Sequence, residues 1–226
     1  MVVARWTPPL PGRLIAARQT PLVGRRIELA TLEVLWPEVT AGRRQVMFLG
    51  GEPGAGKTRL IAEVAGALHD IDVTVLAGTC GPDAGIPYQP FTEMLDHLFT
   101  ASPEGSLRKE VADNGGELQR LSAQVRRHCP EVGFGESAGG EVRRHLFDAV
   151  ASLFRALGEG RSLALMIDDL HWAQLPTVAM LEHVVQACSG SPMSWPLSAL
   201  PRRIVPMSWP PGWPSCTDWK ASGAWT

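Results

Sequence analysis

Short, continuously apolar runs alternate along this chain with longer segments whose apolar residues recur every three or four positions. The runs 45–50, 73–77 and 162–167 are apolar throughout or nearly so. Such runs are typical of strands that are buried on both faces of a parallel sheet. Strands that alternate with helices imply right-handed crossovers. The pattern therefore predicts an α/β fold, with an open, doubly wound, mostly parallel sheet flanked by helices.

Helical spacing of apolar residues predicts the elements between these strands. The expected helices cover about 60–68, 91–99, 117–128, 141–157 and 177–187. An earlier short helix, with Leu29, Leu32 and Trp36 on one face, is expected to end at Pro37. The polar, glycine-rich residues 103–116 are interpreted as a surface connection. We divide the chain into a loose leader (1–20), one α/β domain (21–190) and an irregular tail (191–226).

Composition narrows the class of protein. The 226 residues are 45% hydrophobic and 19% charged, with a net charge of −2, as in an ordinary globular domain. This charge gives no electrostatic footprint for nucleic acid or an anionic membrane. Four scattered cysteines show no metal-ligand spacing, and no apolar run approaches the ~20 residues of a membrane span. We therefore expect a cytoplasmic protein with no membrane partner and no direct DNA binding.

A glycine-rich turn, Gly51-Glu52-Pro53-Gly54-Ala55-Gly56-Lys57-Thr58, lies between the first strand and a helix. It fits the phosphate-binding pattern G-x-x-x-x-G-K-[ST]. Its glycines allow positive φ and close approach of the backbone, while N–H groups at the helix N-terminus face an anion. Lys57 is expected to reach the β- and γ-phosphates of ATP, and the Thr58 hydroxyl to join the Mg²⁺ shell. We predict that the whole turn, together with Arg59, binds nucleotide.

Two carboxylates, Asp168 and Asp169, end the third strand. Ligands in open parallel sheets lie outside the carboxyl ends of the strands, which brings these acids near the bound phosphates. Asp168 is predicted to hold Mg²⁺ through its water shell, and Asp169 to orient or deprotonate the attacking water. Solvated acids that cap the next helix are the alternative, and the glycine-rich turn argues against it.

Four motifs occur in the order of a known family. They are Pro21-Leu22-Val23-Gly24-Arg25, the turn extended through Arg59-Leu60, Gly85-Ile86-Pro87-Tyr88-Gln89-Pro90-Phe91, and Asp168-Asp169-Leu170-His171-Trp172-Ala173. Residues 21–190 thereby resemble the AAA/STAND-type P-loop ATPase module of large ATP-binding LuxR-type transcriptional regulators. Similar modules are fused to adenylate cyclases and protein kinases.

The resemblance implies a signal-gated switch that is closed with ADP and self-associates with ATP. It implies that Val23 and Gly24 lie near the adenine. His171 and Trp172 belong to the family signature, and packing under the sheet edge is as good an explanation for them as contact with nucleotide. The chain departs from the family at Gln174, where an acid is common, and lacks a recognisable strand with a polar γ-phosphate sensor after the 177–187 helix. The family's lid, winged-helix, sensor and helix-turn-helix regions are not found, which puts ATP turnover in question.

Three functions remain open on these grounds. The first is ATP binding with slow, Mg²⁺-dependent hydrolysis in the switch module of a regulator. The second is a fragment that binds nucleotide without catalysis, and the third is a small-molecule kinase. The doubled acid Asp168-Asp169 suits activation of water better than binding of a phosphoryl acceptor.

The composition changes near residue 191, where tryptophans and prolines accumulate without any period. Tryptophan is encoded only by TGG and proline by CCN, so each Trp-Pro pair becomes a Leu-Ala-type pair in the neighbouring frame. Residues 209–220 then become an amphipathic helix, and residues 193–196 become the kind of strand that is missing. We interpret the tail as a truncated, frameshifted continuation of the family sequence, with a genuine partner-binding tail as the alternative. Coding DNA without those alternate codons would exclude the frameshift.

Overall fold

The computed structural model describes residues 6–41, 45–82, 86–103, 105–111, 114–130, 140–159, 162–188, 193–198 and 205–207. Five strands in this part of the chain form one sheet in the order β2-β3-β4-β1-β5. They are β1 (Gln45–Leu49), β2 (Thr74–Thr79), β3 (Leu163–Asp168), β4 (Met193–Ser198) and β5 (Val205–Met207). All neighbours are parallel except β5, which runs antiparallel to β1 at one edge. The predicted α/β fold with a mostly parallel sheet is confirmed.

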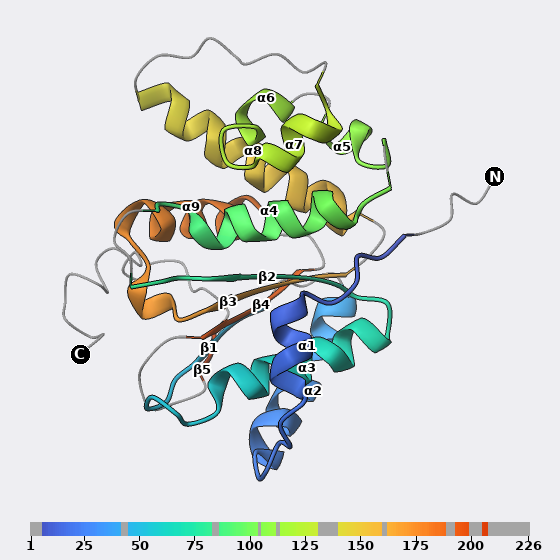
Figure 1. Cartoon of the computed structure of the whole chain (residues 1–226). Coiled ribbons are helices and arrows are strands. Elements are labelled where there is room, and N and C mark those ends of the chain that lie inside the picture. The colour runs from blue at the N-terminus through green and yellow to red at the C-terminus, as the bar shows by residue number, and fades with distance from the viewer. Residues whose placement is uncertain are drawn as a thin grey trace.

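Helices cover both faces of this sheet (Figure 1). One face carries α1 (Gly12–Arg18), α2 (Arg26–Thr40) and α3 (Lys57–Asp70). The other carries α4 (Gln89–Ala101), α8 (Gly140–Gly158) and α9 (Leu175–Ala187), with the short α5 (Arg108–Val111), α6 (Gly115–Leu118) and α7 (Ala123–His128) outside α4 and α8. None of the helices in the described residues is long and apolar enough to cross a membrane.

The alternation of side chains along the strands divides the core into two layers. Leu165 and Ile167 pack with α4, α8 and α9, whereas Ala164 and Met166 pack with α1 and α3. Every residue of β3 is buried, so the strand has no polar face. This explains why the sequence shows a continuous apolar run there rather than an alternating one.

The N-terminal segment differs from the loose leader that we predicted. Leu10 and Leu14 are buried against α3, β2 and β3, and α1 packs along α3. His69 of α3 and His97 of α4 lie 3.2 Å and 2.8 Å from the carbonyl oxygens of Pro8 and Pro9. Two apolar side chains and two hydrogen bonds thus hold the segment beside the β2 edge, although its prolines conceal any helical period.

Two further boundaries differ from the prediction. Helix α2 continues through Pro37 to Thr40, because the Pro37 carbonyl accepts the Ala41 N–H at 3.0 Å and closes the last turn. Residues 103–116 are more than a surface connection, since Leu107, Val111 and the following Leu118 are buried.

The predicted helix over 117–128 is divided in two. Helix α6 ends at Leu118, and Ser122 begins α7 by accepting the N–H groups of Gln124 and Val125. A serine at this position is a strong N-cap, which explains the restart.

The tail contains two strands that the sequence analysis did not predict. β4 lies between β3 and β1, so a strand does follow the 177–187 helix. Pro196 lies in the middle of this central strand, and the register with β3 passes from Ala164–Ser194 directly to Ile167–Leu197. Proline has no N–H to donate to a ladder and is unusual inside a central strand. The remaining tail, 199–204 and 208–226, lies outside the described residues.

We expect Gly78→Ala to destabilise the protein. A Cβ on Gly78 of β2 would come within 2.2 Å of the Pro90 carbonyl oxygen and 2.4 Å of its Cα, so the backbone at the start of α4 would have to move. The expected loss is about 1–3 kcal/mol in the free energy of unfolding, measured by urea denaturation. Gly12→Ala is the matched control, because its Cβ would meet no atom within 4 Å. Equal stability of the two variants would contradict the close approach of β2 to α4.

Candidate functional site

The glycine-rich turn connects the buried strand β1 to the N-terminus of α3. Gly54 and Gly56 adopt positive φ, 78° and 80°, and Gly56 is the N-cap of α3. Gly51, for which we also expected positive φ, does not adopt it. Its need for a small side chain is steric, since a Cβ there would lie 3.4 Å from that of Ala55 and 3.7 Å from the Lys57 chain.

Lys57 and Thr58, the first two residues of α3, face different partners. The Lys57 ammonium donates to the carbonyls of Gly51 at 2.9 Å and Glu52 at 3.1 Å, so it lies folded over the turn. The Thr58 hydroxyl donates to Asp168 Oδ2 at 2.6 Å, across 110 residues of sequence. The sequence analysis predicted that Thr58 and Asp168 share one cation, and the structure brings an oxygen of each side chain together.

The acidic end of β3, Asp168 and Asp169, is held by its own backbone. Asp168 is 9% exposed, and its Oδ1 accepts the Asp169 N–H at 2.9 Å. Asp169 adopts the left-handed conformation, with φ 54° and ψ 37°, at the start of the short 3₁₀ helix η1 (Leu170–Trp172). A non-glycine residue in this region is strained, and such strain is common at functional sites.

The two acids differ in their electrostatic surroundings. Burial raises the pKa of Asp169, and the charge of Asp168 raises it further. His171, Lys57 and Arg13, in that order, oppose this rise in the pKa of Asp169. The His171 Nδ1 lies 3.9 Å from Asp169 Oδ1. Asp169 is thus a carboxylate of raised basicity beside the glycine-rich turn 51–58, the phosphate cradle. A group that accepts a proton from water needs such basicity.

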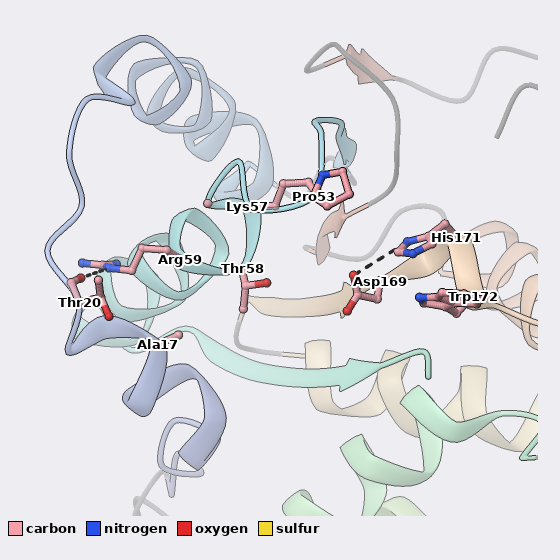
Figure 2. A pocket seen from close by; sticks show the side chains of 11 residues that line it. Ala17, Thr20, Pro53, Lys57, Thr58, Arg59, Asp169, His171 and Trp172 are labelled. Atoms are coloured by element: carbon pink, nitrogen blue, oxygen red, sulfur yellow. Dashed lines mark hydrogen bonds and ion pairs between the residues drawn. The ribbon is translucent and has the colours of Figure 1, made fainter. Parts of the chain in front are cut away.

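A cavity of about 630 Å³ opens between the glycine-rich turn and the acidic end of β3. Figure 2 shows Asp169, His171 and Trp172 on one side of it, and Thr20 and Arg59 on the other. Its lining residues are Ala17, Thr20, Pro53, Gly54, Gly56, Lys57, Thr58, Arg59, Asp169, His171 and Trp172. His171 and Trp172 therefore face the cavity, with their rings 5.1 Å apart and Trp172 49% exposed. Their packing under the sheet edge, the alternative from sequence, does not describe them.

Residues of the N-terminal segment complete the cavity, and the sequence analysis missed them. Ala17 and Thr20 line it, and the Arg59 Nε donates to the Thr20 carbonyl. Arg59, expected on the nucleotide, also pairs with Glu63 at 2.6 Å. No periodicity or motif in residues 1–20 could have indicated this, because the contacts arise only when α1 packs on α3.

Val23 and Gly24, predicted near the adenine, are not among the residues that line the cavity. Val23 is 86% exposed, and Gly24 has a φ of 74°. Their neighbour Arg25 reaches the turn instead, where its guanidinium donates to the Ala55 carbonyl and pairs with Glu28 at 2.6 Å. The left-handed backbone of Gly24 and Arg25 thus turns the chain across the cradle.

The donor set at this site fits Mg²⁺ better than an ion caged by protein. Among the described residues, no cluster of three or more histidine, cysteine or acidic side chains could hold a metal ion. Mg²⁺ in nucleotide sites is usually held by one or two protein oxygens, with phosphates and waters completing the octahedron. Thr58 Oγ1 and Asp168 Oδ2 are two such oxygens at the mouth of a phosphate cradle.

The comparisons with known proteins agree with this geometry. The profile of the AAA ATPase domain family matches residues 21–195. An uncharacterized protein of Rhizobium meliloti (strain 1021), R02095, is 25% identical over an alignment of 173 residues, and the alignment covers 67% of this chain and 16% of that protein. The chain thus spans a small part of its relative's length, whereas the family profile covers most of the chain itself. Together with the glycine-rich turn and the acidic strand end, this match shows that the chain belongs to the AAA ATPase domain family.

Proposed function

We propose that this chain binds Mg·ATP and Mg·ADP and hydrolyses ATP slowly, as the nucleotide switch of a signal-responsive transcriptional regulator. The observation that carries the proposal is the 2.6 Å contact between the Thr58 hydroxyl and Asp168 beside the cradle. It supports a site in which one cation bridges the turn after β1 and the end of β3. The regulatory role rests on the resemblance of the four sequence motifs to those of LuxR-type regulators.

Each residue of the site has a defined task in this proposal. The N–H groups of the turn, at the N-terminus of α3, hold the β- and γ-phosphates, and Lys57 leaves the carbonyls of Gly51 and Glu52 to join them. When bound, Mg²⁺ neutralises the phosphate charge. Asp169 orients the attacking water and accepts its proton, and the nearby His171 limits the orientations of that carboxylate.

Slow turnover follows from the charges around the γ-phosphate position. The one arginine among the residues that line the cavity, Arg59, is held by the Thr20 carbonyl and by Glu63. Without an arginine on the γ-phosphate, a P-loop enzyme can turn over at only on the order of 10⁻⁴ s⁻¹. A second copy of the domain could supply one, which is the physical basis on which we propose self-association with ATP.

Single-turnover measurements with γ-labelled ATP separate this function from its alternatives. Release of labelled phosphate supports hydrolysis. Binding without any reaction indicates a non-catalytic nucleotide-binding fragment, and transfer of label to an added acceptor indicates a small-molecule kinase. The paired acids Asp168 and Asp169 favour the first outcome.

Lys57→Ala should abolish stabilisation of the protein by nucleotide. A ligand that binds only the native state contributes about 2.7 kcal/mol at ~100-fold over its Kd, which is a readily visible rise in Tm. The variant loses this rise because its cradle lacks the cation that faces the phosphates. Lys109→Ala, at an exposed position of α5, is the matched control and should keep the full rise. Equal rises in Tm for wild type and Lys57→Ala would show that the glycine-rich turn does not bind the phosphates.

The two acids should give different phenotypes. Asp168→Asn is expected to weaken Mg²⁺-dependent nucleotide binding, because it takes a formal charge from the metal shell and weakens the acceptor of the Thr58 hydroxyl. Asp169→Asn should leave that binding intact and lower only the rate of phosphate release, by about 10²-fold or more. Calorimetric titration with Mg·ADP and single-turnover rates measure the two effects. Identical behaviour of both variants would show that the roles are assigned wrongly.

We expect no sequence-specific binding of duplex DNA by this chain. Its net charge is −2, whereas proteins that neutralise several phosphates present a basic surface. Fluorescence anisotropy with labelled duplexes at physiological ionic strength tests this. Salt-sensitive, sequence-selective binding would contradict the expectation.

A further inference from the structure

The segment upstream of the matched ATPase region is fixed at three places along the β2 edge. His69 and His97, on opposite faces of the sheet, contact the carbonyls of Pro8 and Pro9. Leu14 of α1 is buried in the core, with 3% of its surface exposed. At its far end the segment reaches the nucleotide cavity, where the Thr20 carbonyl accepts the Arg59 Nε (Figure 2). Contacts before, within and after helix α1 therefore dock it beside the site.

This position brings Arg13 to the acidic end of β3. The Arg13 guanidinium lies 3.7 Å from Glu93 Oε2 of α4. Burial lowers the pKa of Arg13, but the charges of Glu93, Asp168 and Asp169 all oppose that change. An arginine does not lose its proton in proteins. Arg13 is therefore a permanent cation in the field of three carboxylates.

Glu93 connects this cation to the backbone of Asp168. Its Oε2 accepts the N–H of Thr79, the last residue of β2, at 2.9 Å. Thr79 is the register partner of Asp168, and the next residue, Cys80, donates its N–H to the Asp168 carbonyl at 3.0 Å. Glu93, which pairs with Arg13, thus bonds to the β2 residue that lies opposite Asp168, the predicted metal ligand.

We propose that Arg13 is the resident counter-cation of the acidic end of β3, so that α1 sets how tightly the site takes Mg²⁺. The inference rests on the proposed function, because it assumes that Asp168 belongs to the Mg²⁺ site. Without a metal, the positive charge of Arg13 compensates the negative charge of the carboxylates. When Mg²⁺ binds, the same charge repels it. The site consequently takes Mg²⁺ together with a nucleotide, whose phosphates add negative charge, in preference to Mg²⁺ alone.

The sign of the effect distinguishes this role from a structural one. Removal of a nearby positive charge strengthens the attraction of Asp168 and Asp169 for a divalent cation. A residue that merely held α1 or β2 in place would have the opposite effect, because a displaced Asp168 binds Mg²⁺ more weakly. Glu93→Gln should act in the reverse direction, since it removes one negative charge while its amide oxygen can still accept the Thr79 N–H.

The experiment is a Mg²⁺ titration of the full chain at saturating ADP, followed by the rise in Tm. Arg13→Gln should lower the Mg²⁺ concentration for the half-maximal rise by about two- to tenfold, and Glu93→Gln should raise it by a similar factor. Arg13→Lys keeps the charge and should stay near wild type. Arg18→Gln is the matched control on the same helix, because its guanidinium lies against Gly66 of α3. It should also stay near wild type.

An unchanged or raised Mg²⁺ requirement in Arg13→Gln would overturn the inference, as would an equal decrease in Arg18→Gln. If Arg13→Gln does not fold, the direction of the change in Glu93→Gln decides. The proposed function fails separately, if Lys57→Ala keeps its nucleotide-dependent rise in Tm. If Lys57→Ala loses the nucleotide-dependent rise in Tm but Arg13→Gln leaves the Mg²⁺ requirement unchanged, the proposed function stands and only the counter-cation role of Arg13 is overturned.

Discussion

The contact between the Thr58 hydroxyl and Asp168 is the constraint on which the rest of the site depends. These residues are 110 positions apart, and they meet because β1 and β3 run in the same direction on either side of β4. Carboxyl ends of parallel strands share one edge of the sheet, so the turn after β1 and the acids after β3 must face each other. A glycine-rich turn or an acidic strand end by itself would be half of a site, and the parallel sheet joins the two halves.

The same edge explains why strain and charge concentrate there. Asp169 adopts a left-handed backbone, and its partial burial raises its pKa. Such features lower stability and persist only where the surrounding structure holds them. Here the support comes from the fully buried β3 and from the pairing of β2 with it. A stable two-layered core thus carries a local site that is less stable than its surroundings.

The N-terminal segment solves a separate problem of the fold. β2 is an edge strand, and an edge with free N–H and C=O groups invites pairing with other chains. Residues 6–18 lie beside this edge and contact a helix on each face of the sheet. Because its chain then continues to Thr20, the segment that lies beside this edge also forms a wall of the cavity. The docking of this segment beside the sheet and the completion of the cavity are consequences of one packing arrangement.

The sequence by itself determined the features that depend on local chemistry. The continuous apolar runs indicated β1 to β3, and the pattern Gly51–Thr58 indicated the cradle. It could not determine the features in which a tertiary contact overrides local preference. Helix α1 is held by its packing on α3 rather than by its own pattern. Strand β4 occupies the centre of the sheet despite Pro196, because it has a parallel partner on each side. The same holds for Arg13, Ala17 and Thr20, which carry no motif and join the site only through the docking of α1. Residue type and spacing are sufficient where the chemistry requires a particular side chain. The neighbours of that side chain are decided by packing between distant segments, which only the tertiary structure shows.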